Sequence, residues 1–156
     1  MSRTRVVDEW LFHDLIGEKG KGRRQEAGRF LQTLIARCDR LAIPPPSPWL
    51  DKAYRLMRRT DPRTREASRL LHLYILANPE KAQRLPKGDL PSLPDILAQR
   101  VAEADVYLVR CALAASADAL ITTDQRLAEA LAASTLPIRV HRREDFLKEY
   151  LRPQPG

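Results

Sequence analysis

The stretch Ala119-Leu-Ile-Thr-Thr-Asp124 decides the fold class of this chain. Its first four residues are an apolar run of the length expected for a buried strand, and Thr123-Asp124 marks the exit from that strand. Residues 125–133 follow at once, with Leu127 and Leu131 at helical spacing. A buried strand that leads directly into a helix is the repeating unit of an α/β fold with a parallel sheet.

Other segments on both sides of this stretch repeat the pattern. Short apolar or β-prone runs predict strands at Arg5–Asp8, Leu41–Ile43 and Pro137–Val140, and Glu9–Phe12 continues the first run as a further β-prone segment. Apolar residues at helical spacing predict helices over residues 25–39, 47–57, 66–76, 95–116 and 144–151. This order predicts a three-layer α/β/α fold with a mostly parallel, four- or five-stranded sheet.

The sequence predicts two irregular segments within a single domain. Gly17–Arg24 holds three glycines and four cations, which predicts a flexible basic loop. Residues 79–94 are rich in Pro, Lys and Gly and look like a connector within a domain, because neither flank holds a core of typical domain size. We therefore expect one domain over residues 1–151 and a disordered tail at 152–156.

The composition favours an anionic partner. The chain has 156 residues, of which 44% are hydrophobic, so disordered and fibrous classes are excluded. Its net charge is +7, and 21 of its 27 basic residues are arginine, the side chain best shaped to bind phosphate. No stretch approaches the roughly 18 to 20 apolar residues that a membrane span needs, so we expect a cytoplasmic protein that does not bind a membrane.

The cysteines and histidines give little support for zinc. Cys38 and Cys111 are far apart and form no Cys-x-x-Cys pair, and the three histidines have no metal-binding spacing. A metal in this protein would therefore be held by oxygen ligands.

Three acids do not fit a purely structural role. Asp8 and Asp124 each follow an apolar strand, which puts both at the carboxyl ends of parallel strands, where open α/β sheets bind ligands. Asp105 lies on the inward face of the helix that precedes the 119–122 strand and could complete the cluster. Three converging carboxylates repel one another unless a cation lies among them, and oxygen ligands of this kind suit Mg²⁺ or Mn²⁺.

Each acid also has a simpler interpretation. Asp124 could be only the N-cap of the 125–133 helix. Asp8 could pair with an arginine, since an unpaired acid in a buried strand costs several kcal/mol. Asp105 could be a helix-start acid if the helix breaks near Ala102 and restarts at Glu103.

The sequence resembles the PIN-domain nucleases, a family that includes the toxin ribonucleases of bacterial and archaeal toxin–antitoxin pairs. The resemblance covers nearly the whole chain in order and spacing. It rests on four segments: Val6-Val7-Asp8, Asp105-Val-Tyr-Leu-Val-Arg-Cys-Ala112, Ala119-Leu-Ile-Thr-Thr-Asp124 and Ile138-Arg-Val-His-Arg-Arg-Glu-Asp-Phe-Leu147. Each segment is short, so the weight comes from the four together.

The resemblance implies a metal-dependent endoribonuclease that hydrolyses phosphodiester bonds in RNA. Asp8, Asp105 and Asp124 would be catalytic and would hold Mg²⁺ or Mn²⁺, and Thr123 would orient a carboxylate. Family members commonly have asparagine where this chain has Trp10, and a glutamate on the helix after the second strand. Asp51 is the candidate for that fourth acid, and Glu9 is the second candidate.

The resemblance also implies partners. A small antitoxin protein would bind the chain, and two copies would form a homodimer. Cations beside the presumed site would contact phosphates without reading sequence, and the candidates are Lys19, Lys21, Arg23 and Arg24.

Three other functions stay open. The first is a PIN-like module that binds nucleic acid or protein without cleaving it, which the two departures from the family favour. The second is a receiver domain, which needs a phosphoacceptor aspartate and a lysine that this chain does not offer at the required strand ends. The third is an unrelated α/β module whose acids are caps and ion pairs.

Overall fold

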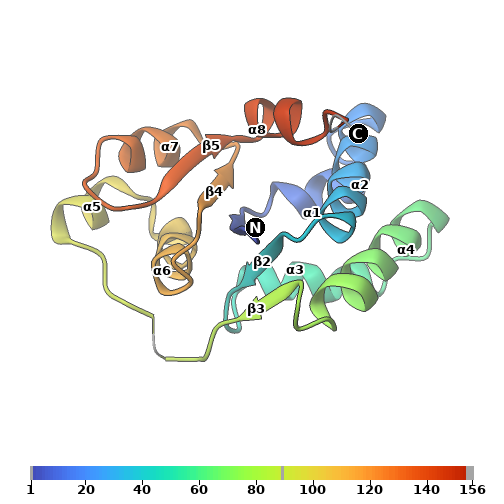
Figure 1. Ribbon diagram of the computed structural model, residues 1–156, viewed down its shortest axis with the longest axis horizontal. Coiled ribbons are helices and arrows are strands. Elements are labelled where there is room, and N and C mark those ends of the chain that lie inside the picture. Colours follow the sequence, from blue (N-terminus) through green and yellow to red (C-terminus); the bar gives the residue numbers. More distant parts are fainter. Residues whose placement is uncertain (1, 89, 154–156) are drawn as a thin grey trace.

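The computed structural model describes residues 2–88 and 90–153, and it has a five-stranded, all-parallel sheet with helices on both faces (Figure 1). The predicted three-layer α/β/α fold is confirmed. The strands are β1 (Thr4–Val7), β2 (Arg40–Ile43), β3 (Ala82–Arg84), β4 (Ala119–Thr122) and β5 (Arg139–Arg142), and they lie in the order β3-β2-β1-β4-β5.

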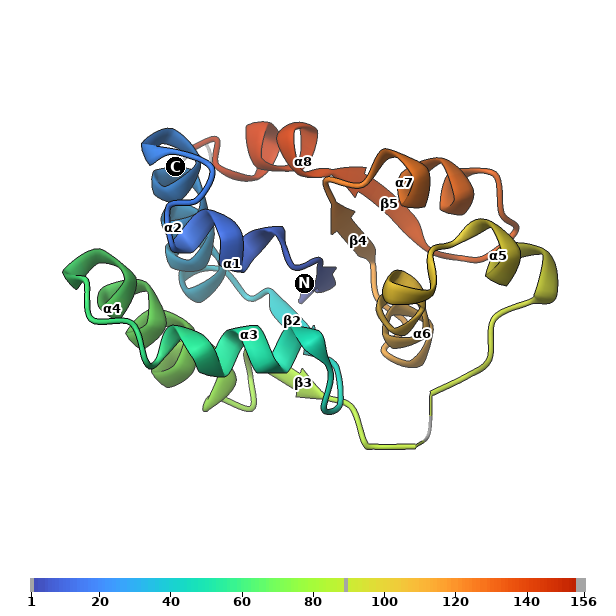
Figure 2. The same cartoon turned by 180° about the vertical axis from the view of Figure 1, so that it is seen from behind.

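Helices connect the strands and continue past the last of them. They are α1 (Trp10–Leu15), α2 (Lys21–Ala36), α3 (Pro48–Leu56), α4 (Pro62–Arg69), α5 (Asp95–Arg100), α6 (Val106–Ala114), α7 (Gln125–Ala132) and α8 (Arg143–Tyr150). A π-helical segment, η1 (Leu70–Leu76), continues α4, and a single 3-10 turn, η2 (Glu103–Asp105), precedes α6. In two opposite views α1, α2 and α4 lie on one side of the sheet and α5, α6 and α7 on the other (Figures 1 and 2).

The central strands β1 and β4 are buried along their whole length, whereas β5 at the edge alternates between exposed and half-buried residues. The chain runs outward from β1 to β3, then crosses back to β4 and β5. Because crossovers between parallel strands are right-handed, the two directions place their helices on opposite faces. The carboxyl ends of β1 and β4 therefore meet at one edge of a sheet that is covered on both sides.

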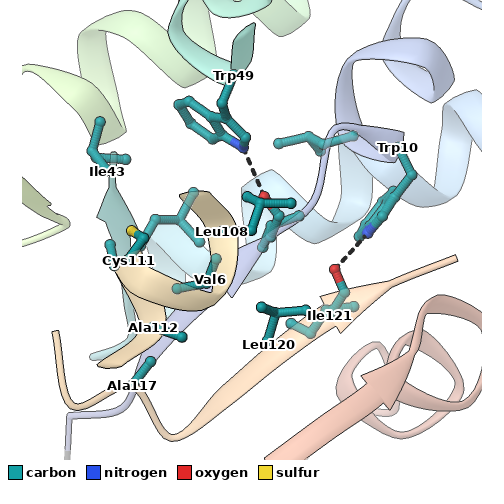
Figure 3. Packing of buried hydrophobic residues seen from close by; sticks show 14 of the residues in the cluster. Val6, Trp10, Ile43, Trp49, Leu108, Cys111, Ala112, Ala117, Leu120 and Ile121 are labelled. Carbon is teal, nitrogen blue, oxygen red and sulfur yellow. Dashed lines mark hydrogen bonds between the residues drawn. The ribbon is translucent and has the colours of Figure 1, made fainter. Parts of the chain in front are cut away.

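Two tryptophans fasten helices to that edge. Trp49 of α3 is 1% exposed, and its indole N–H donates to the Val7 carbonyl at 2.7 Å. Trp10 of α1 donates in the same way to the Ile121 carbonyl at 3.1 Å (Figure 3). In each tryptophan the apolar ring is buried, and the indole N–H forms a hydrogen bond with a carbonyl near the end of a central strand.

The N-terminal segments differ from the prediction. The predicted β-prone segment Glu9–Phe12 does not form a strand, because α1 starts at Trp10. Its tryptophan ring packs into the core, and this packing overrides a local strand preference. The predicted loop at Gly17–Arg24 is shorter than expected, since α2 begins at Lys21 after Gly20, whose φ of 102° suits glycine.

The second half of the chain holds further differences. The segment 79–94 contains β3, a strand of three residues whose sequence Ala-Gln-Arg carries almost no strand signal. The predicted helix at 95–116 breaks at Val101 and Ala102, which have extended backbone, and it restarts through η2. The last strand lies at 139–142, so α8 starts at Arg143.

Of the predicted tail at 152–156, residues 154–156 lie outside the described residues, and Arg152 forms an ion pair with Glu149 at 3.2 Å.

Across residues 2–88 and 90–153, no helix combines the length and the apolar character that a membrane crossing requires.

Replacing Trp49 by phenylalanine tests the anchoring of α3. Trp49→Phe keeps an aromatic ring but leaves the buried Val7 carbonyl without its donor, so we expect the free energy of unfolding to fall by about 1 to 3 kcal/mol. Tyr54→Phe on the half-exposed face of the same helix is the matched control. Urea unfolding followed by circular dichroism measures both, and equal stability of the two variants would contradict the anchoring role.

Candidate functional site

Asp8 lies directly after β1 and is 8% exposed. Its Oδ2 accepts a hydrogen bond from Thr122 Oγ1 at 2.6 Å, and its Oδ1 accepts one from the Glu9 N–H at 2.6 Å. Burial raises the pKa of Asp8, and these two hydrogen bonds oppose that shift only in part. No arginine forms an ion pair with Asp8 among the described residues, so the simpler interpretation of this acid as one half of such a pair is wrong.

Asp124 follows β4 and caps α7. The Leu127 N–H donates to its Oδ1 at 3.1 Å, which confirms the N-cap interpretation. The cap uses one carboxylate oxygen, and within the described residues no basic side chain forms an ion pair with Asp124. Capping and ligand binding are therefore compatible in this residue.

Asp105 reaches the other two acids from the start of α6. It is the last residue of η2, and the helix restarts here, as the interpretation of Asp105 as a helix-start acid requires. The Asp105 side chain nevertheless makes no capping hydrogen bond. Partial burial, followed by the nearby charges of Asp8 and Asp124, raises the pKa of Asp105 to about 6, and the Asp105 and Asp124 carboxyl groups are close enough to share a hydrogen bond. The structure thus brings Asp8, Asp105 and Asp124 together.

The threonine that supports this cluster is Thr122, one residue before the predicted Thr123. Thr122 Oγ1 donates to Asp8 and accepts from the Asp124 N–H at 3.0 Å, so a single buried hydroxyl links two of the acids. Thr123 is exposed, and its carbonyl accepts from Arg142 Nη2 at 3.1 Å.

The two candidates for a fourth acid have different positions. Asp51 is exposed on α3, and it is neither on the cavity wall nor among the groups that shift the pKa values of the cluster. Glu9 lies beside the cluster and raises the pKa values of Asp8 and Asp105. Its carboxylate already contacts Lys52 Nζ at 2.6 Å and the Tyr107 hydroxyl at 2.9 Å.

A cavity of about 350 Å³ opens beside the acids. Part of its wall is acidic and part is cationic: the acids are Asp8, Glu9, Asp14 and Asp124, and the cations are Lys19, Arg23 and Lys52. Asp105 lies next to this wall without forming part of it. A cavity with both kinds of charge suits a ligand that carries both a cation and an anionic group.

The predicted phosphate-binding cations separate into two kinds. Lys19 and Arg23 line the cavity, and Lys21 is exposed at the start of α2. Arg24 is used within the fold: its guanidinium donates to the carbonyls of Leu15 and Ile16 and to Asp61, all at 3.1 Å.

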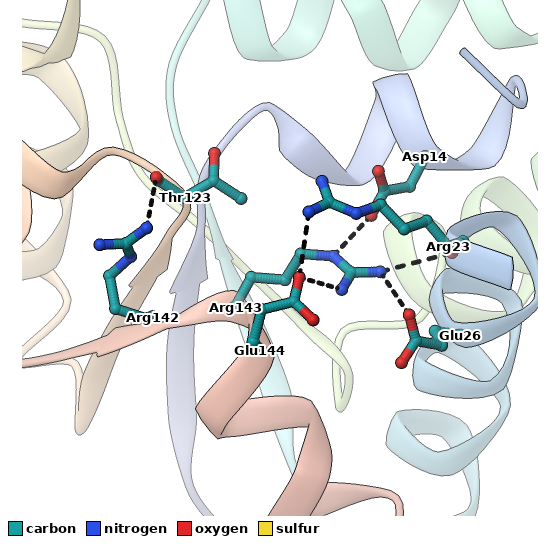
Figure 4. A network of polar contacts seen from close by, with 7 residues as sticks. All are labelled: Asp14, Arg23, Glu26, Thr123, Arg142, Arg143 and Glu144. Atoms are coloured by element: carbon teal, nitrogen blue, oxygen red, sulfur yellow. Dashed lines mark hydrogen bonds and ion pairs between the residues drawn. The ribbon is translucent and has the colours of Figure 1, made fainter. Parts of the chain in front are cut away.

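Arg143, which the sequence analysis did not single out, is the centre of a polar network that includes Asp14 of the cavity wall (Figure 4). It is 1% exposed, and its Nε donates to Asp14 Oδ2 at 2.6 Å, while its two Nη atoms contact Glu26 and Glu144 at 3.2 and 2.8 Å. Its guanidinium also lies 5.2 Å from the centre of the Trp10 ring. This network ties α8 to α1 and α2, and no local sequence pattern marks it.

The acid cluster fits Mg²⁺ or Mn²⁺ by the chemistry of its donors. The three carboxylates supply oxygen only, and none of them takes part in an ion pair within the described part of the chain. No three His, Cys, Asp or Glu side chains among those residues are already arranged around one metal position. Mg²⁺ commonly uses one or two carboxylates and keeps several waters, so two of these acids are a sufficient donor set.

No family model matches the chain, and no curated protein or solved structure is significantly similar to it.

The raised pKa of Asp105 predicts a pH-dependent effect on stability. The folded protein holds the Asp105 proton up to about pH 6, whereas the unfolded chain releases it near the ordinary value of 3.8, so ionisation of Asp105 lowers the free energy of unfolding as pH rises through this window. In EDTA, Asp105→Asn is expected to be more stable than the wild type at pH 7.5, and this advantage should disappear below pH 4.

Urea unfolding at pH 4 and pH 7.5 measures this difference, and a carboxyl ¹³C titration gives the Asp105 pKa directly. Glu80→Gln, which removes an exposed carboxylate in a turn, is the control and should follow the wild type. An Asp105→Asn variant that is less stable than the wild type at pH 7.5 would contradict the proximity of the three acids.

Proposed function

We propose that this protein is a metal-dependent endoribonuclease of the PIN-domain type, which hydrolyses phosphodiester bonds in RNA. The observation that carries the proposal is the convergence of Asp8, Asp105 and Asp124, none of which forms an ion pair with a basic side chain of residues 2–88 and 90–153. Like charges that burial brings together destabilise a fold, and a divalent cation relieves this cost. The fold class, the net charge of +7 and the cationic wall of the cavity are consistent with an RNA substrate.

The residues of the chain would act in different ways. Asp105 and Asp124 would hold Mg²⁺ or Mn²⁺, and the neighbouring Asp8 would add negative charge. The metal would supply Lewis-acid activation of the phosphate and a water of lowered pKa. Thr122 would keep Asp8 oriented, because its hydroxyl donates to that carboxylate and fixes it relative to the start of α7.

Cations beside the site would bind the phosphates of the strand. Lys19 and Arg23 line the same cavity as Asp8 and Asp124, and Lys21 is exposed at the start of the helix that carries Arg23. Such contacts give affinity that does not depend on base sequence and weakens with salt. RNA as substrate is consistent with a cytoplasmic location.

The proposal extends to the toxin of a toxin–antitoxin pair. Its support is the resemblance of the four sequence segments to PIN-domain toxins, which pair with a small antitoxin protein and form homodimers. Co-purification with the product of an adjacent gene and sedimentation of the isolated chain would test these two partners separately.

A second candidate function is a PIN-like module that binds nucleic acid or a protein without cleaving it. The observation in its favour is the missing fourth acid: Asp51 is exposed away from the cavity, and both oxygens of Glu9 have partners. Divalent-metal binding distinguishes the two functions.

Cleavage of labelled RNA tests the nuclease directly. Asp124→Asn removes the charge but keeps an N-cap side chain that stabilises α7, so we expect loss of cleavage of at least about 100-fold with a stability close to that of the wild type. The assay uses single-stranded and structured RNA with Mg²⁺, Mn²⁺ or EDTA. Asp51→Asn on α3 is the matched control and should cleave normally.

The outcomes separate the two functions. Metal-dependent cleavage by the wild type and by Asp51→Asn, lost in Asp124→Asn and Asp8→Asn, supports the nuclease. Wild-type protein that binds RNA but cuts it under none of these conditions supports the binding module.

A further inference from the structure

Lys52 is a fixed cation in the cavity that the sequence analysis did not single out. It lies on α3, whose start is held by the Ser47 cap at 3.4 Å and by the buried Trp49. The Lys52 side chain is 29% exposed, and its ammonium group contacts Glu9 Oε1 at 2.6 Å and His13 Nε2 at 3.2 Å. Two residues of another helix, the N-cap residue Glu9 of α1 and His13 within α1, therefore determine where this charge lies.

The hydrogen-bond chemistry assigns the direction of these contacts. An ammonium group has three N–H donors and no acceptor, so His13 Nε2 must accept from Lys52. His13 Nδ1 then carries the hydrogen and donates to Glu18 Oε2 at 2.7 Å. Two of the three N–H bonds of Lys52 are used in this way, and within the described residues no acceptor takes the third.

The other two cations of the cavity wall are less constrained. Lys19 is exposed, and Arg23 Nη2 shares Glu144 with Arg143 at a distance of 3.3 Å. Lys52 alone combines partial burial, two anchoring partners and a free donor on the cavity wall. A cation that is already oriented loses little side-chain entropy when it binds an anion.

We propose that Lys52, held by Glu9 and His13, is a phosphate-binding residue that contacts a nonbridging oxygen of an RNA phosphate in this cavity. The proposal rests on the proposed function for the nature of the strand, and it assigns Lys52 to the substrate rather than to the metal. The acids Asp8 and Asp124 on the cavity wall repel a phosphate that approaches them, so a cationic donor on the same wall is needed to hold it. Lys52 supplies this donor, and Lys19 and Arg23 add positive charge to the cavity wall.

A binding assay tests the role of Lys52 separately from cleavage. The probe is a fluorescein-labelled single-stranded RNA of twelve nucleotides, followed by fluorescence anisotropy in EDTA so that the probe is not consumed. Lys52→Gln should raise the Kd about tenfold, because it removes a charged hydrogen bond. It should also reduce the slope of log K against log salt by about 0.7, the value for one phosphate contact on a single strand.

Three variants make the result interpretable. Lys52→Arg keeps the charge and should retain most of the affinity and the salt slope. His13→Ala removes one anchoring partner, so it should raise the Kd while the salt slope stays unchanged. Lys148→Gln on the exposed face of α8 makes the same charge change outside the cavity and should bind as the wild type does.

The outcomes distinguish this proposal from the proposed nuclease. Equal Kd and salt slope for Lys52→Gln and Lys148→Gln would overturn the role of Lys52, even if the wild type cleaves RNA. A selective loss of binding in Lys52→Gln supports the phosphate subsite, even if the wild type cleaves nothing. Wild-type protein that neither binds RNA in this assay nor cleaves it with Mg²⁺ or Mn²⁺ would overturn both, and urea unfolding verifies that each variant is folded.

Discussion

The pairing of β1 with β4 is the constraint on which the site depends. Val7 lies opposite Ile121, and the Ile121 carbonyl accepts from the Asp8 N–H at 3.0 Å and from the Trp10 indole. This register puts Asp8 next to Thr122, so the hydroxyl can reach both acids that follow the two strands. A shift of one residue would turn the side chains of one strand to the opposite face and separate Asp8 from Thr122.

The buried acids of the chain fall into two groups, which differ in whether an arginine balances their charge. Asp14 pairs with Arg143 at 2.6 Å, and Asp39 pairs with Arg5 at 2.8 Å, so their charges are balanced within the fold. Asp8, by contrast, is buried with only uncharged donors around it. The chain is rich in arginine, yet no arginine pairs with Asp8 among the described residues. An unpaired carboxylate is costly in a buried position such as this one.

The sequence was sufficient for the features that depend on strand ends. Asp8 and Asp124 follow apolar runs, and parallel pairing brings such positions together whatever the order of the outer strands. The predictions that were wrong concern features that depend on which face of a strand or helix a residue occupies, and on tertiary contacts. Thr122 is the last residue of β4 and Thr123 follows the strand, and only the register of β4 with β1 decides which of the two hydroxyls reaches Asp8. Asp51 and Lys52 are neighbours on α3, and a rotation of about 100° along the helix decides which one enters the cavity. Strand β3 has no pattern of its own, since its formation depends on the edge of β2.

Glu9 explains how the acidic and cationic parts of the cavity coexist. Its carboxylate accepts from Tyr107 of α6 and pairs with Lys52 of α3, so it joins the helix that follows Asp105 to the helix that carries the free donor. Burial, together with Glu9, raises the pKa of Tyr107, which keeps the phenol protonated as a donor. Both carboxylate oxygens of Glu9 have partners, Lys52 and Tyr107, although Glu9 follows Asp8 directly in the chain. Asp8, by contrast, forms no ion pair among the described residues, so two adjacent residues of the chain differ in whether the fold balances their charge.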